Sequence, residues 1–156
     1  MHNLMIQQIE SIIEDEKNII ANLANISALI NMNFENINWV GFYFYENSQL
    51  ILGPFQGNVA CTRLYPGKGV CMKAMETRTV QNIADVHTFK GHVVCDSASM
   101  SELVIPLVIN DEPYGVLDID SPVKNRFSEK DQKAFEEIGH IIERMISEST
   151  KKGKSE

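Results

Sequence analysis

The three cysteines are the residues of this chain best suited to redox chemistry. Cys95 follows a short apolar pair and precedes small hydroxylated residues at 96–101, a composition that favours a turn or loop. A thiol on a loop is reachable and its thiolate is a nucleophile, although most single cysteines are inert and buried. Cys61, Cys71 and Cys95 follow one another at spacings of ten and twenty-four residues. This odd number does not indicate a structural disulfide framework, and it leaves redox chemistry, metal binding or coincidence open.

Three carboxylates form a second candidate group. In a strand over 114–120, Asp118 and Asp120 would share one face. Two neighbouring carboxylates on one face need a cation, a shared proton or water, so a solvent-facing surface is an equally good interpretation. Glu102 would lie opposite Asp120 in a hairpin with a five-residue turn, or with a bulge near Pro106. In that register all three acids would share one face.

An aromatic run over 38–45 supplies a candidate wall for a ligand. In a strand, Trp39, Gly41 and Tyr43 would share one face, while the apolar residues between them would face the core. A flat indole beside a glycine gap and a hydroxyl-tipped ring could line a ligand site. A small second core is an equally good interpretation of the same residues.

The remaining pattern predicts the elements that must position these groups. Intervals of three and four between apolar residues predict terminal helices, and turn residues separate short strand-like runs. The predicted helices cover 6–30, 70–76 and 128–146, and the predicted strands cover 38–45, 50–52, 79–83, 103–109 and 114–120. The acidic residues 14–16 leave open whether the first helix is one or two. Terminal helices around strands predict an α+β domain with an antiparallel sheet.

Two local features refine this picture. The segment 53–69 is rich in glycine, proline and small residues and is predicted to be a long, loop-like connection that includes Cys61. Cys71 would lie in the first turn of the helix over 70–76, where the helix dipole would stabilise its thiolate.

Length and charge limit the classes of protein to consider. A chain of 156 residues with 44% hydrophobic residues predicts one domain over 1–150, followed by a short disordered basic tail at 151–156. The net charge of -7 argues against nucleic acid and anionic membranes as partners. No leader-like start or apolar run long enough to cross a membrane is present, so we expect a cytoplasmic protein.

Taken together, these motifs resemble the free methionine-R-sulfoxide reductase family, a catalytic branch of the GAF domains. The residues that carry the resemblance are 38–43, 53–57, 60–61, 67–71, the loop around Cys95, and 115–120. The resemblance implies an antiparallel sheet of about six strands. It also implies terminal helices on one face of that sheet and a closed ligand pocket on the other.

The resemblance also implies roles for individual residues. Cys95 would be the nucleophile, Cys61 the preferred resolving thiol and Cys71 a third, auxiliary thiol. The substrate-binding residues would be Trp39, Glu102, Asp118 and Asp120. The substrate would be the free amino acid sulfoxide, with no bound cofactor or metal. Thioredoxin, kept reduced by thioredoxin reductase and NADPH, would regenerate the enzyme.

This chemistry suits the residue types. A thiolate that attacks a sulfoxide sulfur needs a proton delivered to the departing oxygen, and a carboxyl kept neutral by acidic neighbours is a suitable donor. Carboxylates would also favour the ammonium group of a free amino acid. Cys95 would become a sulfenic acid, which condenses with a second thiol. Which carboxylate donates the proton stays open at this stage, as does the formation of a homodimer.

Three alternatives remain. The chain could be a non-catalytic GAF module that binds a small molecule, or a GAF module that senses oxidants through its thiols. A zinc site is the third, built from Cys61, Cys71 and Cys95 with His87 or His92, although no CxxC or HxxxH pair is present.

Overall fold

A six-stranded antiparallel sheet forms the centre of the molecule, with strand order β3-β2-β1-β6-β5-β4. The computed structural model describes residues 2–154. The strands are β1 (Trp39–Glu46), β2 (Gln49–Gly57), β3 (Arg63–Leu64), β4 (Gln81–Ile83), β5 (Ser101–Ile109) and β6 (Glu112–Ser121). The helices are α1 (His2–Ile13), α2 (Ile19–Asn33), α3 (Val70–Thr77), the short 3-10 helix η1 (Val86–Thr88) and α4 (Glu129–Lys154). The predicted α+β class is confirmed.

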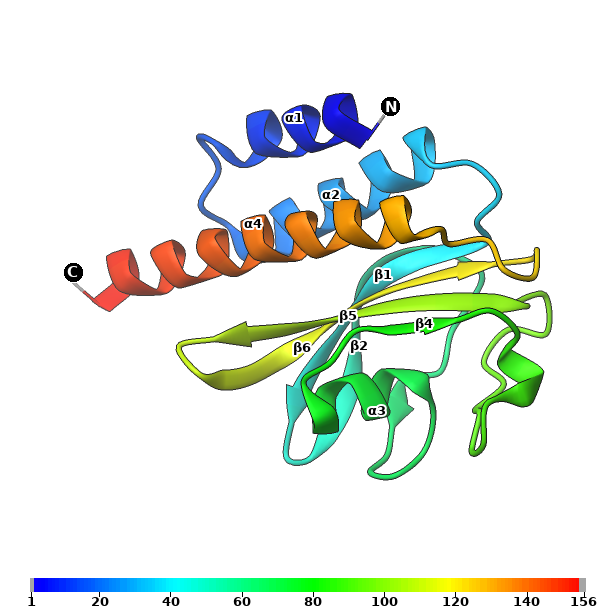
Figure 1. Cartoon of the computed structure of the whole chain (residues 1–156). Helices are drawn as coiled ribbons and strands as arrows, with labels where there is room; N and C mark the ends of the chain where they lie inside the picture. Colours follow the sequence, from blue (N-terminus) through cyan, green and yellow to red (C-terminus); the bar gives the residue numbers. More distant parts are fainter. Residues whose placement is uncertain (1, 155–156) are drawn as a thin grey trace.

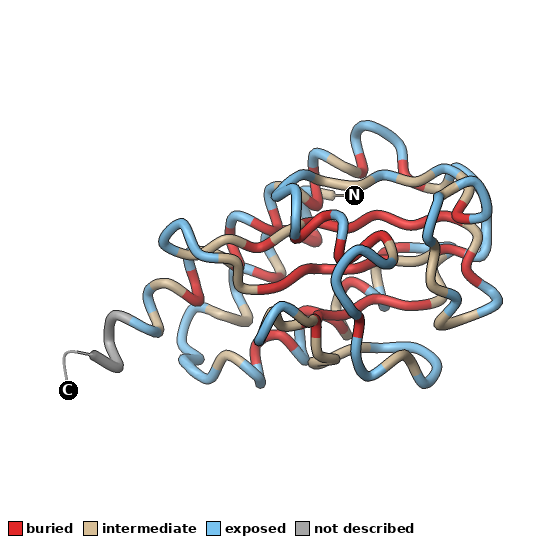
Figure 2. Tube along the Cα trace, turned by 90° about the horizontal axis from the view of Figure 1, so that it is seen from below, coloured by how far each residue is buried: buried red, intermediate tan, exposed pale blue. Residues whose placement is uncertain are grey.

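The sheet separates two hydrophobic cores. Figure 1 shows α1, α2 and α4 covering one face, while α3 and the long loops lie against the other. Alternation along β1 divides its side chains between them: Val40 and Phe42 pack into the helix-covered core, and Trp39 and Tyr43 into the core beneath α3. Figure 2, which looks onto the α3 side, shows buried strands behind a rim of exposed segments. The two faces of β1 were therefore predicted correctly.

The first predicted helix is two helices. The acidic residues 14–16 lie in the connection, where the Glu16 carboxylate accepts hydrogen bonds from the backbone N–H groups of Lys17 and Asn18. Asn18 then caps α2 by accepting from the N–H of Ala21 at 2.9 Å. A side-chain cap thus begins the second helix, after a connection that the Glu16 carboxylate orders.

Strand β2 runs further than the sequence predicted. It continues through Gly53 and Pro54, which were assigned to a loop. β3 pairs with β2 only at Leu50 and Ile51, so no strand pairs with the outer side of β2 at Pro54. The absence of an N–H group in proline therefore removes no hydrogen bond between strands. The loop-like part of the middle segment is shorter as a result.

The β5–β6 hairpin has the register that places all three acids on one face. Glu102 lies opposite Asp120, and the ladder shifts between Leu107 and Val108, one residue after Pro106. Pro106 also lies beyond the three residues of β5 that pair with β4. Of the two arrangements that this register allowed, the structure therefore has the bulge near Pro106.

A capping box begins the C-terminal helix. Ser128 Oγ accepts from the N–H of Asp131 at 3.1 Å, and the Asp131 carboxylate accepts from the N–H of Ser128 at 2.9 Å. The backbone helix continues to Lys154, whereas the end of the predicted basic tail at 151–156 lies outside the described residues. No helix within residues 2–154 combines the length and the apolar character that a membrane span needs.

Candidate functional site

Three neighbouring strands bring the predicted acids and the indole together. Trp39 of β1 lies opposite Asp120 of β6, which in turn lies opposite Glu102 of β5. Asp118 lies two residues before Asp120 and points to the same face. Glu102 and Asp118 are 8% and 5% exposed, so the acids do not form a solvent-facing surface. That alternative is wrong, because α3 and the loops cover this face of the sheet.

Burial makes these carboxyl groups hard to ionise. It raises the pKa of Glu102 and Asp118 well above the usual range, and the charge of a neighbouring acid raises each further. The pKa of Asp120 is raised by burial and then by Glu102. One oxygen each of Asp118 and Asp120 is buried without a hydrogen-bond partner in the described chain. Burial therefore favours the protonated form of these acids, and the unpartnered oxygens of Asp118 and Asp120 are acceptors available to a ligand.

Two of the three cysteines are bonded to each other. Cys61, between β2 and β3, and Cys95, between η1 and β5, form a disulfide with their Cα atoms 5.3 Å apart. Both residues are half-buried, so the Cys95 loop is not sealed in the core. Tyr43 helps to fix this arrangement, because its hydroxyl donates to the Cys61 carbonyl oxygen at 2.8 Å.

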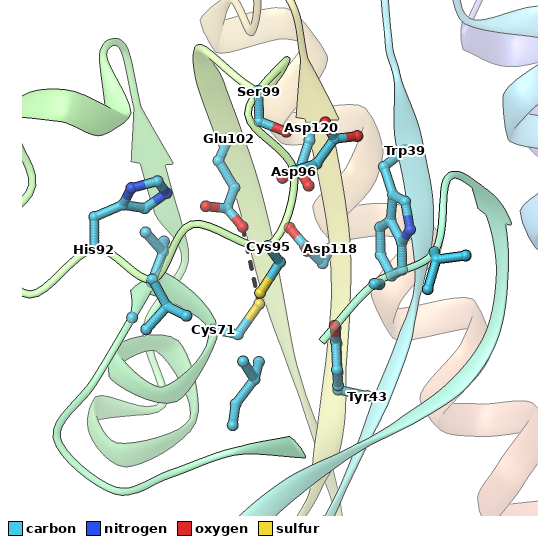
Figure 3. Close-up of a pocket in the computed structure, with 16 residues that line it drawn as sticks. Trp39, Tyr43, Cys71, His92, Cys95, Asp96, Ser99, Glu102, Asp118 and Asp120 are labelled. Carbon is cyan, nitrogen blue, oxygen red and sulfur yellow. Dashed lines mark hydrogen bonds between the residues drawn. The ribbon is translucent and has the colours of Figure 1, made fainter. Parts of the chain in front are cut away.

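A small cavity of about 40 Å³ joins these groups. Its wall is made by the sheet on one side and by α3 and the two cysteine-bearing loops on the other (Figure 3). The polar and sulfur-containing residues that line it are Trp39, Tyr43, Cys71, His92, Cys95, Asp96, Ser99, Glu102, Asp118 and Asp120. Four of them are acids, and the lining contains no lysine or arginine.

Comparison with known proteins identifies this arrangement. A family model described as GAF domain matches residues 23–147. The free methionine-R-sulfoxide reductase of Escherichia coli (strain K12) is 46% identical over 132 residues, which cover 85% of this chain and 80% of that one. The chain belongs to the free methionine-R-sulfoxide reductase family. The resemblance inferred from the sequence and the GAF-like fold are thus confirmed.

Solved structures of this reductase family superimpose closely. The reduced form of fRMsr of Staphylococcus aureus gives a TM-score of 0.90 at 50% identity, covering 93% of this chain and 94% of that one. The free methionine-R-sulfoxide reductase from Neisseria meningitidis, in complex with its substrate, gives a TM-score of 0.93 at 37% identity. That match covers 97% of this chain and 91% of the Neisseria chain.

The third cysteine differs from its prediction. Cys71 does lie in the first turn of α3, but it is 5% exposed and its Sγ donates to Glu102 Oε2 at 3.9 Å. Burial, followed by the charges of Asp118 and Glu102, raises the pKa of the thiol well above its usual value. The predicted stabilisation of its thiolate is wrong, because burial among acids outweighs the dipole of a short helix.

This thiol also bears on the zinc alternative. The ligand atoms of Cys71, Glu102 and Asp118 lie within 4.8 Å of one another, a spacing that a metal ion could bridge. A zinc site with three cysteine ligands would need three thiolates. Cys61 and Cys95 are instead bonded to each other, so the three-cysteine arrangement does not exist in this structure.

Two further side chains lie near the reductase site: Asn38, which was not predicted from the sequence, and His92, which was considered only as a zinc ligand. Asn38 Nδ2 donates to Asp96 Oδ2 at 3.2 Å and to Ser99 Oγ at 3.0 Å, and so ties the Cys95 loop to the start of β1. His92 lines the cavity, and Figure 3 shows its imidazole on the Glu102 side. Burial and then the nearby His87 lower the pKa of His92. In the sequence, the signal for a place of His92 near the site was its position three residues before Cys95.

Proposed function

We propose that this protein reduces free L-methionine-R-sulfoxide to methionine. The proposal depends on one observation: the Cys61–Cys95 disulfide borders a buried acidic cavity. No lysine or arginine of the described chain lines this cavity, so its acids have no cationic partner there. The E. coli, S. aureus and N. meningitidis relatives bear the name of this reductase, and the Neisseria structure was solved with its substrate.

A free amino acid would meet complementary groups in the pocket. Its ammonium group would bind the unpartnered oxygens of Asp118 and Asp120, because buried acceptors gain most from a cationic donor. Its carboxylate would accept a hydrogen bond from the Ser99 hydroxyl, which lines the cavity, because the backbone N–H groups of residues 98–100 already donate within the chain. The S-methyl group would pack against Trp39, which is 3% exposed and stacks on Phe55 at a ring distance of 5.2 Å. A peptide-bound sulfoxide lacks the ammonium group and would lose the first of these contacts.

Glu102 would be the proton donor. It lies on β5, which continues from the Cys95 loop, and Figure 3 shows its carboxyl group directed toward the sulfur atoms. Burial and then the charge of Asp118 raise the pKa of Glu102, which favours the protonated form that a general acid needs. The Cys95 thiolate would attack the sulfoxide sulfur while Glu102 protonates the oxygen. That oxygen would pass to Cys95 as a sulfenic acid when methionine leaves.

The cycle would close through the second thiol. The Cys61 sulfur would attack the Cys95 sulfenic acid, form the disulfide and release water. A dithiol would then reduce the disulfide, and thioredoxin with thioredoxin reductase and NADPH is the system we propose. Both electrons of each turnover would travel through sulfur, so the reaction would need no bound cofactor or metal.

The decisive experiment follows NADPH consumption with thioredoxin and thioredoxin reductase. We expect turnover with free methionine-R-sulfoxide, and none with the S form or with a peptide-bound sulfoxide. Cys95→Ser should abolish it. Cys61→Ser should release one methionine per chain and then stop, because the sulfenic acid has no internal partner. Turnover in Cys95→Ser would remove that residue from the nucleophile's role. Hydrogen peroxide as the preferred oxidant would favour the thiol-sensing alternative.

A further inference from the structure

Exposed apolar side chains lie close to both bonded cysteines along the chain. Seven large hydrophobic side chains of the described chain are strongly exposed, and three of them lie within four residues of Cys61 or Cys95. These three are Val59, Tyr65 and Val94, which are 89%, 52% and 66% exposed. Such a cluster around a reactive bond is typical of a surface that another protein covers.

The same region carries positive charge in an acidic protein. Residues 47–75 contain Arg63, Lys68 and Lys73 and no aspartate or glutamate, and residues 86–95 contain Lys90 and again no acid. The whole chain has a net charge of -7. Glu76 follows the first segment, where its carboxylate accepts from the N–H of Gly67 at 2.8 Å. Within these two segments the charged residues are all basic, whereas the acids next to the disulfide, Asp96, Glu102, Asp118 and Asp120, line the cavity behind it.

Contacts join the two segments into one surface. The N–H of Gly69 donates to the carbonyl of Gly91 at 3.0 Å, and the Lys73 ammonium lies 5.3 Å from the centre of the Phe89 ring. The disulfide itself connects the segments at their far ends. We name residues 59–73 and 89–95 together the disulfide face. It lies on the α3 side of the sheet, away from α1, α2 and α4 (Figure 1).

We propose that the disulfide face docks a protein dithiol reductant whose nucleophilic cysteine is surrounded by apolar and acidic surface. This inference rests on the proposed function, because it concerns the step that restores the thiols. A small dithiol needs no docking surface, whereas a protein must bring its own cysteine to the bond. Apolar contacts and opposite charge would supply the affinity and the orientation.

Cys61 is the sulfur we expect the reductant to attack. Cys95 lines the acidic cavity, whereas Cys61 is not part of its lining and has exposed neighbours at Thr62 and Arg63. The reductant's thiolate would bond to Cys61 and expel the Cys95 thiolate, which takes up a proton. The reductant's second thiol would lose its proton, attack the mixed disulfide and release Cys61. The partner would leave oxidised by two electrons.

The test compares two reductants on matched variants. The triple variant carries Lys68→Glu, Lys73→Glu and Lys90→Glu. Its KM for a purified thioredoxin of net negative charge should rise at least about tenfold, because three charges that attract the partner become charges that repel it. Turnover driven by dithiothreitol should stay within about twofold of the unaltered protein. The control, Lys130→Glu with Lys133→Glu on α4, reverses exposed charges on the opposite side and should change neither value. Tyr65→Ser should raise the thioredoxin KM and spare the dithiothreitol reaction.

The outcomes separate the two proposals. An unchanged thioredoxin KM in the triple variant, or an equal loss with dithiothreitol, would overturn the docking surface. Absence of dithiothreitol-driven turnover in the unaltered protein would instead overturn the proposed function. A thioredoxin that lacks its second cysteine should be trapped as a mixed disulfide on Cys61, as read by peptide mass mapping. Trapping on Cys95 would refute the proposed route of attack.

Discussion

Replacing Glu102 with glutamine should reduce activity and increase stability at once. Glu102 is 8% exposed, contacts the Cys71 thiol at 3.9 Å and lies among carboxyl groups without a lysine or arginine in the cavity wall. Glutamine has nearly the same shape and also offers a hydrogen-bond donor, but it cannot give up a proton. General acid catalysis contributes about 10²- to 10⁴-fold to a rate, so Glu102→Gln should lower kcat by a factor in that range.

The effect on stability follows from the raised pKa of Glu102. The folded protein keeps the Glu102 proton at pH values where the unfolded chain, with a pKa of about 4.3, has lost it. The free energy of unfolding therefore falls as pH rises from about 4.3 toward the raised pKa, and Glu102→Gln removes this share of the fall. Each tenfold difference in proton affinity corresponds to about 1.4 kcal/mol, or roughly 3–5 °C in Tm for a domain of this size.

Thermal unfolding from pH 4 to pH 9 checks this reasoning, with single-turnover kinetics on the same samples. The Tm advantage of Glu102→Gln should be near zero at pH 4 and should reach about 3 °C or more at pH 8. Exposed Glu137→Gln in the middle of α4 is the matched control and should leave Tm nearly constant. A variant that turns over within a few-fold of the unaltered protein would show that Glu102 is not the acid. A variant less stable at pH 8 would show that folding does not raise the pKa of Glu102.

Other changes test the third thiol, the sheet and the helix cap. Cys71→Ala should keep the Cys61–Cys95 bond, as measured by thiol titration. It should lower kcat/KM no more than about tenfold in steady-state kinetics, because it removes one weak hydrogen bond. Gly115→Ala should cost about 3 kcal/mol in urea unfolding, because its Cβ would collide with the Tyr43 carbonyl oxygen. Ser128→Ala should cost about 1 kcal/mol in the same assay by removing the cap of α4.

The sequence predicts best what depends on the local backbone. Alternation along a strand assigned Trp39 and Val40 to opposite faces, because successive side chains of any strand point to opposite sides. A register that pairs Glu102 with Asp120 was one that the hairpin could adopt with a bulge near Pro106, and the structure has it. The grouping of the acids with the indole came from the family resemblance, because it depends on the order of three adjacent strands.

Features that depend on tertiary packing were not accessible in the same way. Spacing alone could not pair Cys61 with Cys95, since the path of the two loops depends on contacts such as the Tyr43 hydroxyl with the Cys61 carbonyl. The helix dipole argument for Cys71 was wrong because burial by distant residues determines its pKa. Asn38 looked like the first residue of a strand, and its bonds to the Cys95 loop appear only in three dimensions.

The acids and the indole stand on hydrogen-bonded strands, whereas the bonded sulfurs stand on loops. In the proposed reaction, strands would therefore bind the ligand and loops would carry the electron transfer. Removing the sulfurs leaves the frame that would grip a free amino acid intact, so a Cys61→Ser, Cys95→Ser protein should become a pure receptor. Two side-chain changes, with the same fold, would then convert the catalyst into a binding protein.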